Sequence, residues 1–236
     1  MSSNKTDPTA FNPKCEVISS RAITVLLTTI RTKGTTQKEY VAASDRLMSI
    51  LAEEGLARLA GVEERTVETP CGTFAGLAGP PSHTVCAVDI VRSGGILLEA
   101  VRRIAPDLKT AKILIQRDEA TAAPRLYYSK LPADVPRLRV LLCDPMLATG
   151  GSALAAIEVL KRAGVAEDAI LFLNAVACPE GLRALAAGAP GVRIATAALD
   201  DGLDARKFIV PGLGDFGDRY YGTAGYREGW WGTDGR

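Results

Sequence analysis

Histidine is almost missing from this sequence. His83 is the only one among 236 residues, and Ser-His-Asp or Cys-His catalysis needs a histidine that a third group positions. His83 stands in the segment 79–83, where glycine and two prolines predict a surface turn. We therefore do not expect a hydrolase of these classes, and a metal site built from several histidines is excluded.

Paired cysteines and long apolar runs are missing too. The five cysteines, at positions 15, 71, 86, 143 and 178, contain no C-x-x-C pair, so a structural zinc site is not expected. No run approaches the roughly 18 apolar residues of a membrane span, and the polar N-terminus lacks a signal-peptide core. We expect a cytoplasmic protein with reduced thiols.

Charge of one sign is not in excess. The chain has 28 basic and 27 acidic residues, for a net charge of +1, so no global field draws it to nucleic acid or to a membrane. A Walker A loop is ruled out because neither Gly-Lys-Ser nor Gly-Lys-Thr occurs. With 47% hydrophobic residues the composition is globular, and we expect small molecules as partners.

Short apolar runs alternate with helical patterns from Thr84 onward. Runs without polar alternation are typical of strands buried on both faces, and helices between them imply a mostly parallel sheet. The sequence therefore predicts an α/β fold of three layers, with an N-terminal helical part and a small β-hairpin flap. The expected strands are 85–91, 112–115, 140–143, 170–173 and 192–195, and the expected helices are 22–30, 40–59, 96–104, 152–163 and 180–187.

Composition also predicts the domain boundaries. We expect residues 1–18 to form a disordered arm, 19–223 a single domain, and 224–236 a C-terminal extension that is rich in glycine and holds both tryptophans. Short hairpin-like pieces are expected at 66–67 and 73–77.

The segment 140–152 contains the most informative motif. An apolar run leads to Asp144 and then to Thr149-Gly150-Gly151-Ser152 at the start of an amphipathic helix. Consecutive glycines let backbone N–H groups surround a phosphate, and a helix N-terminus favours an anion. Asp144 suits a pair of hydroxyls, so a ribose 5-phosphate matches both halves. The alternative is a plain strand-to-helix turn capped by Ser152.

A second glycine motif, at 212–217, has the spacing G-x-G-x-x-G. A dinucleotide fingerprint needs a following helix, a second strand and an acid about 20 residues on, whereas only 19 residues follow Gly217. We interpret this motif instead as a loop whose bare backbone lies against a flat ligand.

Two arginines follow predicted strands, namely Arg92 before Ser93-Gly94-Gly95 and Arg117 before Asp118-Glu119. An arginine fork matches phosphate oxygens with two parallel hydrogen bonds. Either residue alone is more often a surface arginine. Parallel strands end at one edge of a sheet, however, so both are expected beside the Thr-Gly-Gly-Ser loop.

These segments together resemble the uracil phosphoribosyltransferases from about Ser19 to Thr223. The sequence Asp-Pro-Met-Leu-Ala-Thr-Gly-Gly-Ser at 144–152 is similar to that family's loop for 5-phosphoribosyl-1-pyrophosphate (PRPP), and 209–218 is similar to its uracil segment. The sequence Ile-Gln-Arg-Asp-Glu at 115–119 resembles eukaryotic members of the family more than most bacterial ones. The resemblance implies a type I phosphoribosyltransferase-like fold and the reaction of uracil with PRPP to give UMP and pyrophosphate.

The resemblance also implies site roles. Arg92 and Arg117 would hold the departing pyrophosphate, Asp144 would hold ribose hydroxyls, and Asp215 would lie toward the ribose or the pyrophosphate-bound metal; these four would be the catalytic residues. Uracil would be read by the main chain at Ile209, Gly214 and Phe216, beside Asp215. The rest of the PRPP site would be Pro145, Met146, Leu147, Ala148, Thr149, Gly150, Gly151 and Ser152.

Further expectations come from the same family. Mg²⁺ would arrive as the PRPP complex, held by substrate oxygens and water rather than by a protein cage. A flap over 118–132, with Tyr127, Tyr128 and Lys130, would cover the site, although simple hairpin packing explains the tyrosines equally well. The resemblance implies a homodimer or homotetramer. Regulation by GTP is suggested by the same resemblance, but no residue of this sequence indicates it. Many members have alanine where this chain has Ser93.

Two alternatives stay open. A phosphoribosyltransferase for orotate or a purine is disfavoured, because the carboxylate of orotate would need a cationic partner in the terminal glycine loop. A non-catalytic nucleobase or nucleotide sensor on the same fold is the other alternative. It would be expected to have lost site residues, whereas Arg92, Arg117, Asp144, Thr149 and Asp215 are all present.

Overall fold

A computed structural model describes residues 7–117, 124–223 and 225. Its centre is an eight-stranded sheet in the order β1-β10-β9-β7-β4-β5-β6, with β8 pairing beside β9. All pairs are parallel except β5 with β6. The strands are β1 (Cys15–Val17), β4 (Val85–Val91), β5 (Lys109–Arg117), β6 (Pro124–Lys130), β7 (Arg139–Cys143), β8 (Met146–Leu147), β9 (Ile170–Ala177) and β10 (Arg193–Leu199).

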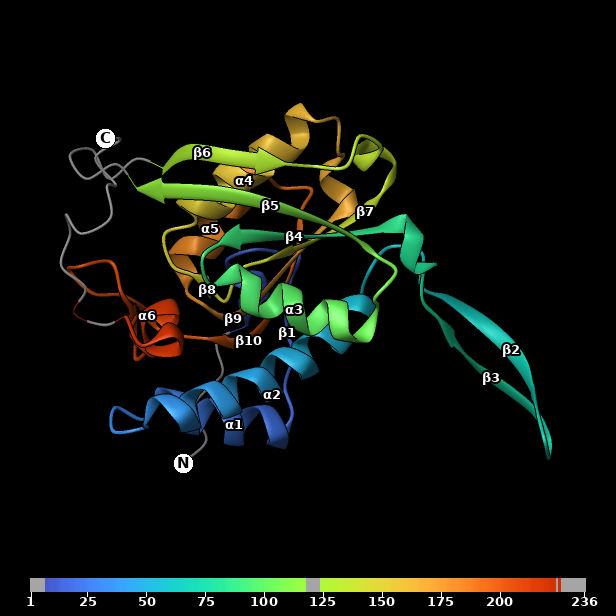
Figure 1. Cartoon of the computed structure of the whole chain (residues 1–236), viewed down its shortest axis with the longest axis horizontal. Coiled ribbons are helices and arrows are strands. Elements are labelled where there is room, and N and C mark those ends of the chain that lie inside the picture. Colours follow the sequence, from blue (N-terminus) through green and yellow to red (C-terminus); the bar gives the residue numbers. More distant parts are fainter. Residues whose placement is uncertain (1–6, 118–123, 224, 226–236) are drawn as a thin grey trace.

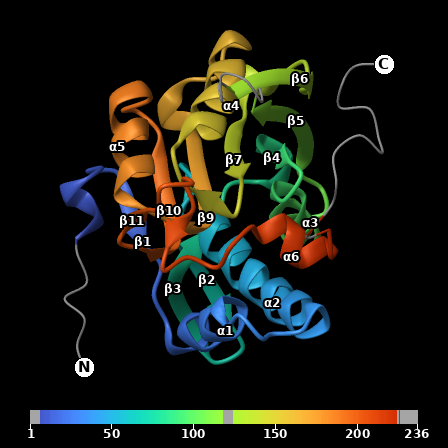
Figure 2. The same cartoon turned by 90° about the vertical axis from the view of Figure 1, so that its left-hand side faces the viewer.

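Helices cover both faces of this sheet (Figures 1 and 2). One layer consists of α1 (Arg21–Arg31), α2 (Gln37–Leu56) and α3 (Gly94–Ile104), and the other of α4 (Gly151–Arg162) and α5 (Pro179–Gly188). Strand β7 serves both layers, because Leu141 and Cys143 pack with the first and Val140 and Leu142 with the second. The predicted three-layer α/β fold is confirmed.

The expected N-terminal arm at 1–18 overlaps a strand of the main sheet. Residues 1–6 lie outside the described part, but Cys15–Val17 form β1 and pair in parallel with β10. The Ser20 side chain then caps α1. Three residues are too few to show a strand pattern, and their partner strand is distant in the sequence. Local reasoning therefore assigns β1 to the arm.

The expected hairpin is confirmed and is longer than predicted. Strands β2 (Glu63–Thr69) and β3 (Gly72–Ala78) pair antiparallel and extend away from the three layers (Figure 1). Three large apolar side chains on it are exposed, Val67 by 41%, Phe74 by 59% and Leu77 by 75%. Val67 and Phe74 lie directly opposite each other across the two strands and form an exposed apolar pair.

Several short elements near the C-terminus were not predicted. Strands β11 (Gly202–Leu203) and β12 (Ile209–Val210) form a separate two-stranded ribbon. The glycine motif at 212–217 opens a helix after all, α6 (Phe216–Tyr221), with Asp215 as its N-cap. At six residues α6 is too short for a periodic pattern. No helix in the described part of the chain has the length and apolar character needed to cross a membrane.

Truncation of Leu141 tests the two-faced core. Leu141 is fully buried on β7, so Leu141→Ala is expected to lower the free energy of unfolding by about 2–5 kcal/mol, through lost burial and the cavity left behind. Val25, which is 63% exposed on α1, is the control, and Val25→Ala should change stability by less than about 0.5 kcal/mol. Urea titration measures both, and equal losses would contradict this description of the core.

Candidate active site

The segment that was expected to bind phosphate lies at the carboxyl end of β7. Asp144 follows the last residue of that strand, and α4 begins at Gly151. Between them Gly150 has a φ of +82°, in the left-handed region that favours glycine. A Cβ at Gly150 would also lie 2.9 Å from the side chain of Ala184 on α5. Both backbone conformation and space therefore require glycine here.

Hydrogen bonds fix the carbonyl groups of this segment. The Pro145 oxygen accepts from two N–H groups of β9, at 2.9 and 3.0 Å, and the Leu147 oxygen accepts from the Cys178 N–H at 3.2 Å. The Cys178 thiol lies 3.1 Å from the Ala148 oxygen. A Cβ at Gly181 would come within 2.6 Å of that same oxygen, so α5 packs directly against the segment.

The segment forms a small cup of about 50 Å³ at the N-terminus of α4. Gly150, the N-cap, has no side chain to bond the first N–H groups of α4, and among these groups the Gly151 N–H makes a long contact of 3.5 Å to the Thr149 hydroxyl. These groups and the positive end of the helix favour an anion. The cup is lined by Asp144, Met146, Leu147, Ala148, Thr149, Gly150, Gly151, Ser152 and Ala153.

A larger cavity of about 380 Å³ adjoins this cup and shares Asp144, Met146 and Ala148 with it. Its other wall comes from the C-terminal part of the chain. The predicted base-binding residues all line it: Ile209, Gly214, Asp215 and Phe216. Sequence reasoning thus placed in one region residues that the fold does bring together.

The wall at Gly214 and Phe216 presents main chain to the cavity. The Phe216 side chain is 1% exposed and packs edge-on against Tyr40, with ring centroids 5.5 Å apart. Gly214, with a φ of +83°, has no side chain to intervene. Such a wall suits a flat ring whose edge is recognised by backbone N–H and C=O groups.

The Asp144 carboxyl, where the cup meets the cavity, has a pKa close to neutral pH. Burial raises the pKa of its carboxyl to about 7, and the negative charge of Asp215 acts in the same direction. Hydrogen bonds from the Met146 backbone N–H and the Ser93 side chain oppose this rise in pKa. Donor groups on a bound ligand would favour the ionised form further.

Arg92 is held at the end of β4 by the C-terminal segment. Its guanidinium contacts the Asp218 carboxylate at 2.6 Å and the Thr223 hydroxyl at 2.8 Å, with Asp215 at 3.8 Å. The side chain is 48% exposed, so it remains open to solvent and to a ligand. Contact with Arg92 lowers the pKa of Asp218. Asp218 and Thr223 are partners that sequence reasoning missed.

Arg117 and the expected flap lie partly outside the described residues. Arg117 ends β5, but its side chain and residues 118–123 of the expected flap lie outside the described part, as does the tail at 226–236. Tyr127, Tyr128 and Lys130 lie on the edge strand β6, where Tyr128 pairs with Leu114. Both tyrosines are about half exposed, and neither is among the described residues that line the cavity or the cup.

Five cavity residues were missed from the sequence. Ser93 and Gly217 stand next to predicted ones, and Arg206, Lys207 and Phe208 precede the base-binding segment. Lys207 has a φ of +68°, which is uncommon for a residue with a side chain and often marks a functional site. The basic pair Arg206-Lys207 before an apolar run was the signal that could have identified this loop.

Comparisons with known proteins agree with this geometry. The family model described as uracil phosphoribosyltransferase matches residues 17–223. Uracil phosphoribosyltransferase from Saccharomyces cerevisiae is 48% identical over 197 residues, covering 83% of this chain and 90% of the yeast protein. The relative of that name from Dictyostelium discoideum is 43% identical over 206 residues, covering 87% and 94%.

A solved structure agrees as well. That of the AQ2163 protein from Aquifex aeolicus is 29% identical to this chain and matches it with a TM-score of 0.76, covering 90% of this chain and all of the Aquifex one. The family model spans most of the chain, and nearly half of the aligned residues are shared with the yeast protein. This chain therefore belongs to the uracil phosphoribosyltransferase family.

Proposed function

We propose that this protein transfers the phosphoribosyl group of PRPP to uracil, giving UMP and pyrophosphate. The observation that supports this most is a cavity with a main-chain wall that adjoins an anion cup, with Asp144 between them. The cup receives the 5′-phosphate, Asp144 accepts from the ribose hydroxyls, and the cavity receives the base. The base is thereby held beside the anomeric carbon of the bound sugar phosphate.

The chemistry is a displacement at that carbon. The bond to the pyrophosphate oxygen breaks, the bond to the uracil ring nitrogen forms, and the proton of that nitrogen passes to the departing pyrophosphate or to water. Positive charge develops on the ribose while negative charge grows on the leaving pyrophosphate. Arg92, open at the end of β4, and Arg117, at the end of β5, stabilise the leaving group more than the bound substrate. Such differential stabilisation raises the rate.

Base choice follows from the main-chain wall. Uracil and cytosine invert their donor and acceptor at ring position 4, so fixed N–H and C=O groups that satisfy one base leave a buried group unpaired with the other. A wall of backbone cannot rotate to accommodate the wrong base. This favours uracil over cytosine through main-chain groups, without a side chain having to distinguish the two bases.

Magnesium accompanies PRPP in this proposal. Asp144 and Asp215 line one cavity and interact electrostatically, and carboxylate oxygens together with phosphate oxygens and water are ligands that Mg²⁺ prefers. The ion neutralises pyrophosphate charge when it is bound. Asp144 and Asp215 are the residues that would face it, while phosphate oxygens and water complete its coordination.

Assembly and location complete the proposal. The exposed apolar side chains of the β2–β3 hairpin, Val67, Phe74 and Leu77, support a homo-oligomer, a dimer or a tetramer. All five cysteines are free thiols, which supports a role in the reducing cytoplasm. The substrates and products are small molecules.

Product formation is the direct test. Purified protein with uracil, PRPP and Mg²⁺ is expected to form UMP and pyrophosphate, measured by chromatography of the nucleotide. Orotate, cytosine and adenine in place of uracil should give far less product. Tight uracil binding by calorimetry without UMP above the blank would instead favour a non-catalytic sensor.

The pKa of Asp144 predicts a pH dependence. Below about pH 7 the carboxyl of the empty site is protonated, whereas ribose hydroxyls donate to the ionised form. PRPP affinity should therefore rise as the pH increases toward 7 and then level off, by up to about tenfold for each pH unit. Binding titrations from pH 5.5 to 8.5 measure this change.

Two variants isolate the contribution of Asp144 from the titration of PRPP itself. Asp144→Asn should weaken binding and remove the protein's part of the pH dependence. Ser93→Ala removes a hydrogen bond that lowers the Asp144 pKa, so the midpoint of the pH profile of PRPP binding should move to higher pH in this variant. Identical profiles for the wild type and Asp144→Asn would contradict the assignment.

Arg117 has a separate test, based on its place at the end of β5. Arg117→Ala is expected to lower kcat/KM for PRPP by about 10–200-fold, the value of one lost charge-assisted contact. Arg162, exposed at the end of α4 and paired with Glu158, is the matched control, and Arg162→Ala should leave kcat/KM unchanged. If Arg117→Ala also leaves it unchanged, Arg117 does not act in the site.

A further inference from the structure

The base-binding segment lacks the anchoring that the other half of the site receives from the main sheet. Its only strand, β12, pairs with the two residues of β11 in a ribbon outside that sheet. The PRPP segment, by contrast, hydrogen-bonds directly to β9. The main-chain wall at Gly214 and Phe216 must therefore be fixed in another way.

An ion pair binds the backbone of one residue of this segment, Gly212. Arg31, the last residue of α1, contacts both carboxylate oxygens of Asp200 at 2.7 Å. Arg31 also donates to the Gly212 oxygen at 2.9 Å, while the Gly212 N–H donates to Asp200 at 2.9 Å. Two hydrogen bonds thus join Gly212 to both members of the pair, and two more join Arg31 to Asp200.

This arrangement is rigid because it is buried and bidentate. The Asp200 side chain is 5% exposed and that of Arg31 is 22% exposed. Charge-assisted bonds in this geometry are stronger and more directional than neutral ones. Gly212 has a φ of +57°, and a Cβ there would lie 2.0 Å from the Ile209 oxygen, so only glycine fits in this turn.

A second arginine holds the next residue to the same helix. Arg219, on α6, donates to the Leu213 oxygen at 2.8 Å and to the oxygens of Ile30 and Thr32 at the end of α1. Its guanidinium lies 4.4 Å from the centre of the Tyr40 ring. Consecutive carbonyls at 212 and 213 are thus both tied to the C-terminal end of α1.

We propose that Arg31 and Asp200 are positioning residues for the pyrimidine base, acting through the backbone of residues 209–217. They contact Gly212, which stands two positions before Gly214 in the wall of the base cavity. Neither is among the described residues that line that cavity or the cup. Small displacements of a main-chain wall are costly, since recognition requires placement within about 0.5 Å. Loss of the pair should therefore weaken uracil binding far more than PRPP binding. This inference rests on the proposed function, because it assumes that 209–217 contacts the base.

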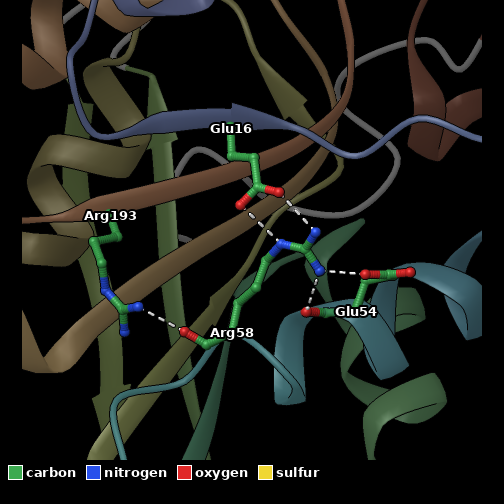
Figure 3. A network of polar contacts seen from close by, with 4 residues as sticks. All are labelled: Glu16, Glu54, Arg58 and Arg193. Carbon is green, nitrogen blue, oxygen red and sulfur yellow. Dashed lines mark hydrogen bonds and ion pairs between the residues drawn. The ribbon is translucent and has the colours of Figure 1, made fainter. Parts of the chain in front are cut away.

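A matched network at the opposite end of the strands supplies the control. Arg58 contacts both carboxylate oxygens of Glu16, at 3.0 and 2.7 Å, and also the Glu54 carboxylate (Figure 3). Arg193 donates to the Arg58 oxygen at 2.6 Å. Arg193 begins β10, whereas Asp200 directly follows its last residue. Arg31 and Arg58 thus make similar bidentate pairs near opposite ends of β10.

The test compares Arg31→Met, Arg31→Lys and Arg58→Met by steady-state kinetics with uracil and PRPP varied in turn. Arg31→Met should raise KM for uracil by about tenfold or more while KM for PRPP changes less than about twofold. Arg31→Lys keeps the charge but loses the fork, so it should restore part of the affinity for uracil. Arg58→Met should lower the melting temperature and leave both KM values unchanged.

The outcomes separate this inference from the proposed function. Absence of UMP formation by the wild type would contradict the proposed function itself. With an active wild type, equal changes in both KM values, or none, in Arg31→Met would overturn the positioning role, as would an equal rise in KM for uracil in Arg58→Met. If Arg31→Met does not fold, Asp200→Asn, which keeps the size of the side chain, gives the same comparison.

Discussion

A parallel sheet that is buried on both faces has little room for polar side chains except at the ends of its strands. That constraint organises this molecule. Residues of β7 alternate between the two helical layers, and the first polar group after them, Asp144, lies between the cup and the cavity. Arg92 follows β4 and Asp200 follows β10 in the same way. The carboxyl edge therefore gathers charged groups that are costly to bury in the interior.

Both acidic and basic side chains lie at this edge of the sheet. Asp144 and Asp215 repel each other across the cavity, which helps to raise the pKa of Asp144, while Arg92 is drawn to Asp218 and Asp215 on the C-terminal segment. A polyphosphate sugar with its metal ion supplies both signs of charge and can satisfy both groups. The net charge of only +1 thus gives no sign of a strongly polar site.

Much of this arrangement could be predicted from the sequence, and the exceptions have physical causes. The apolar runs predict the buried strands, and the motif Asp144–Ser152 predicts the cup at the start of α4. Both features are formed by residues that are neighbours in the sequence. β1 and the Arg31–Asp200 pair escaped notice since each joins residues far apart in the chain. Lys207 escaped because its left-handed conformation is imposed by a loop rather than by local preference. The side chain of Arg117 stays a prediction.

The cysteines acquire a practical meaning from their positions. Four of them are buried, and burial raises the pKa of each thiol, whereas Cys71 is exposed between the two strands of the β2–β3 hairpin. Thiol reagents attack the accessible, ionised form, so in folded protein at neutral pH the chain behaves as a molecule with one reactive sulfur. A spectroscopic label attached there would mark the far end of the hairpin and leave the carboxyl edge of the sheet untouched.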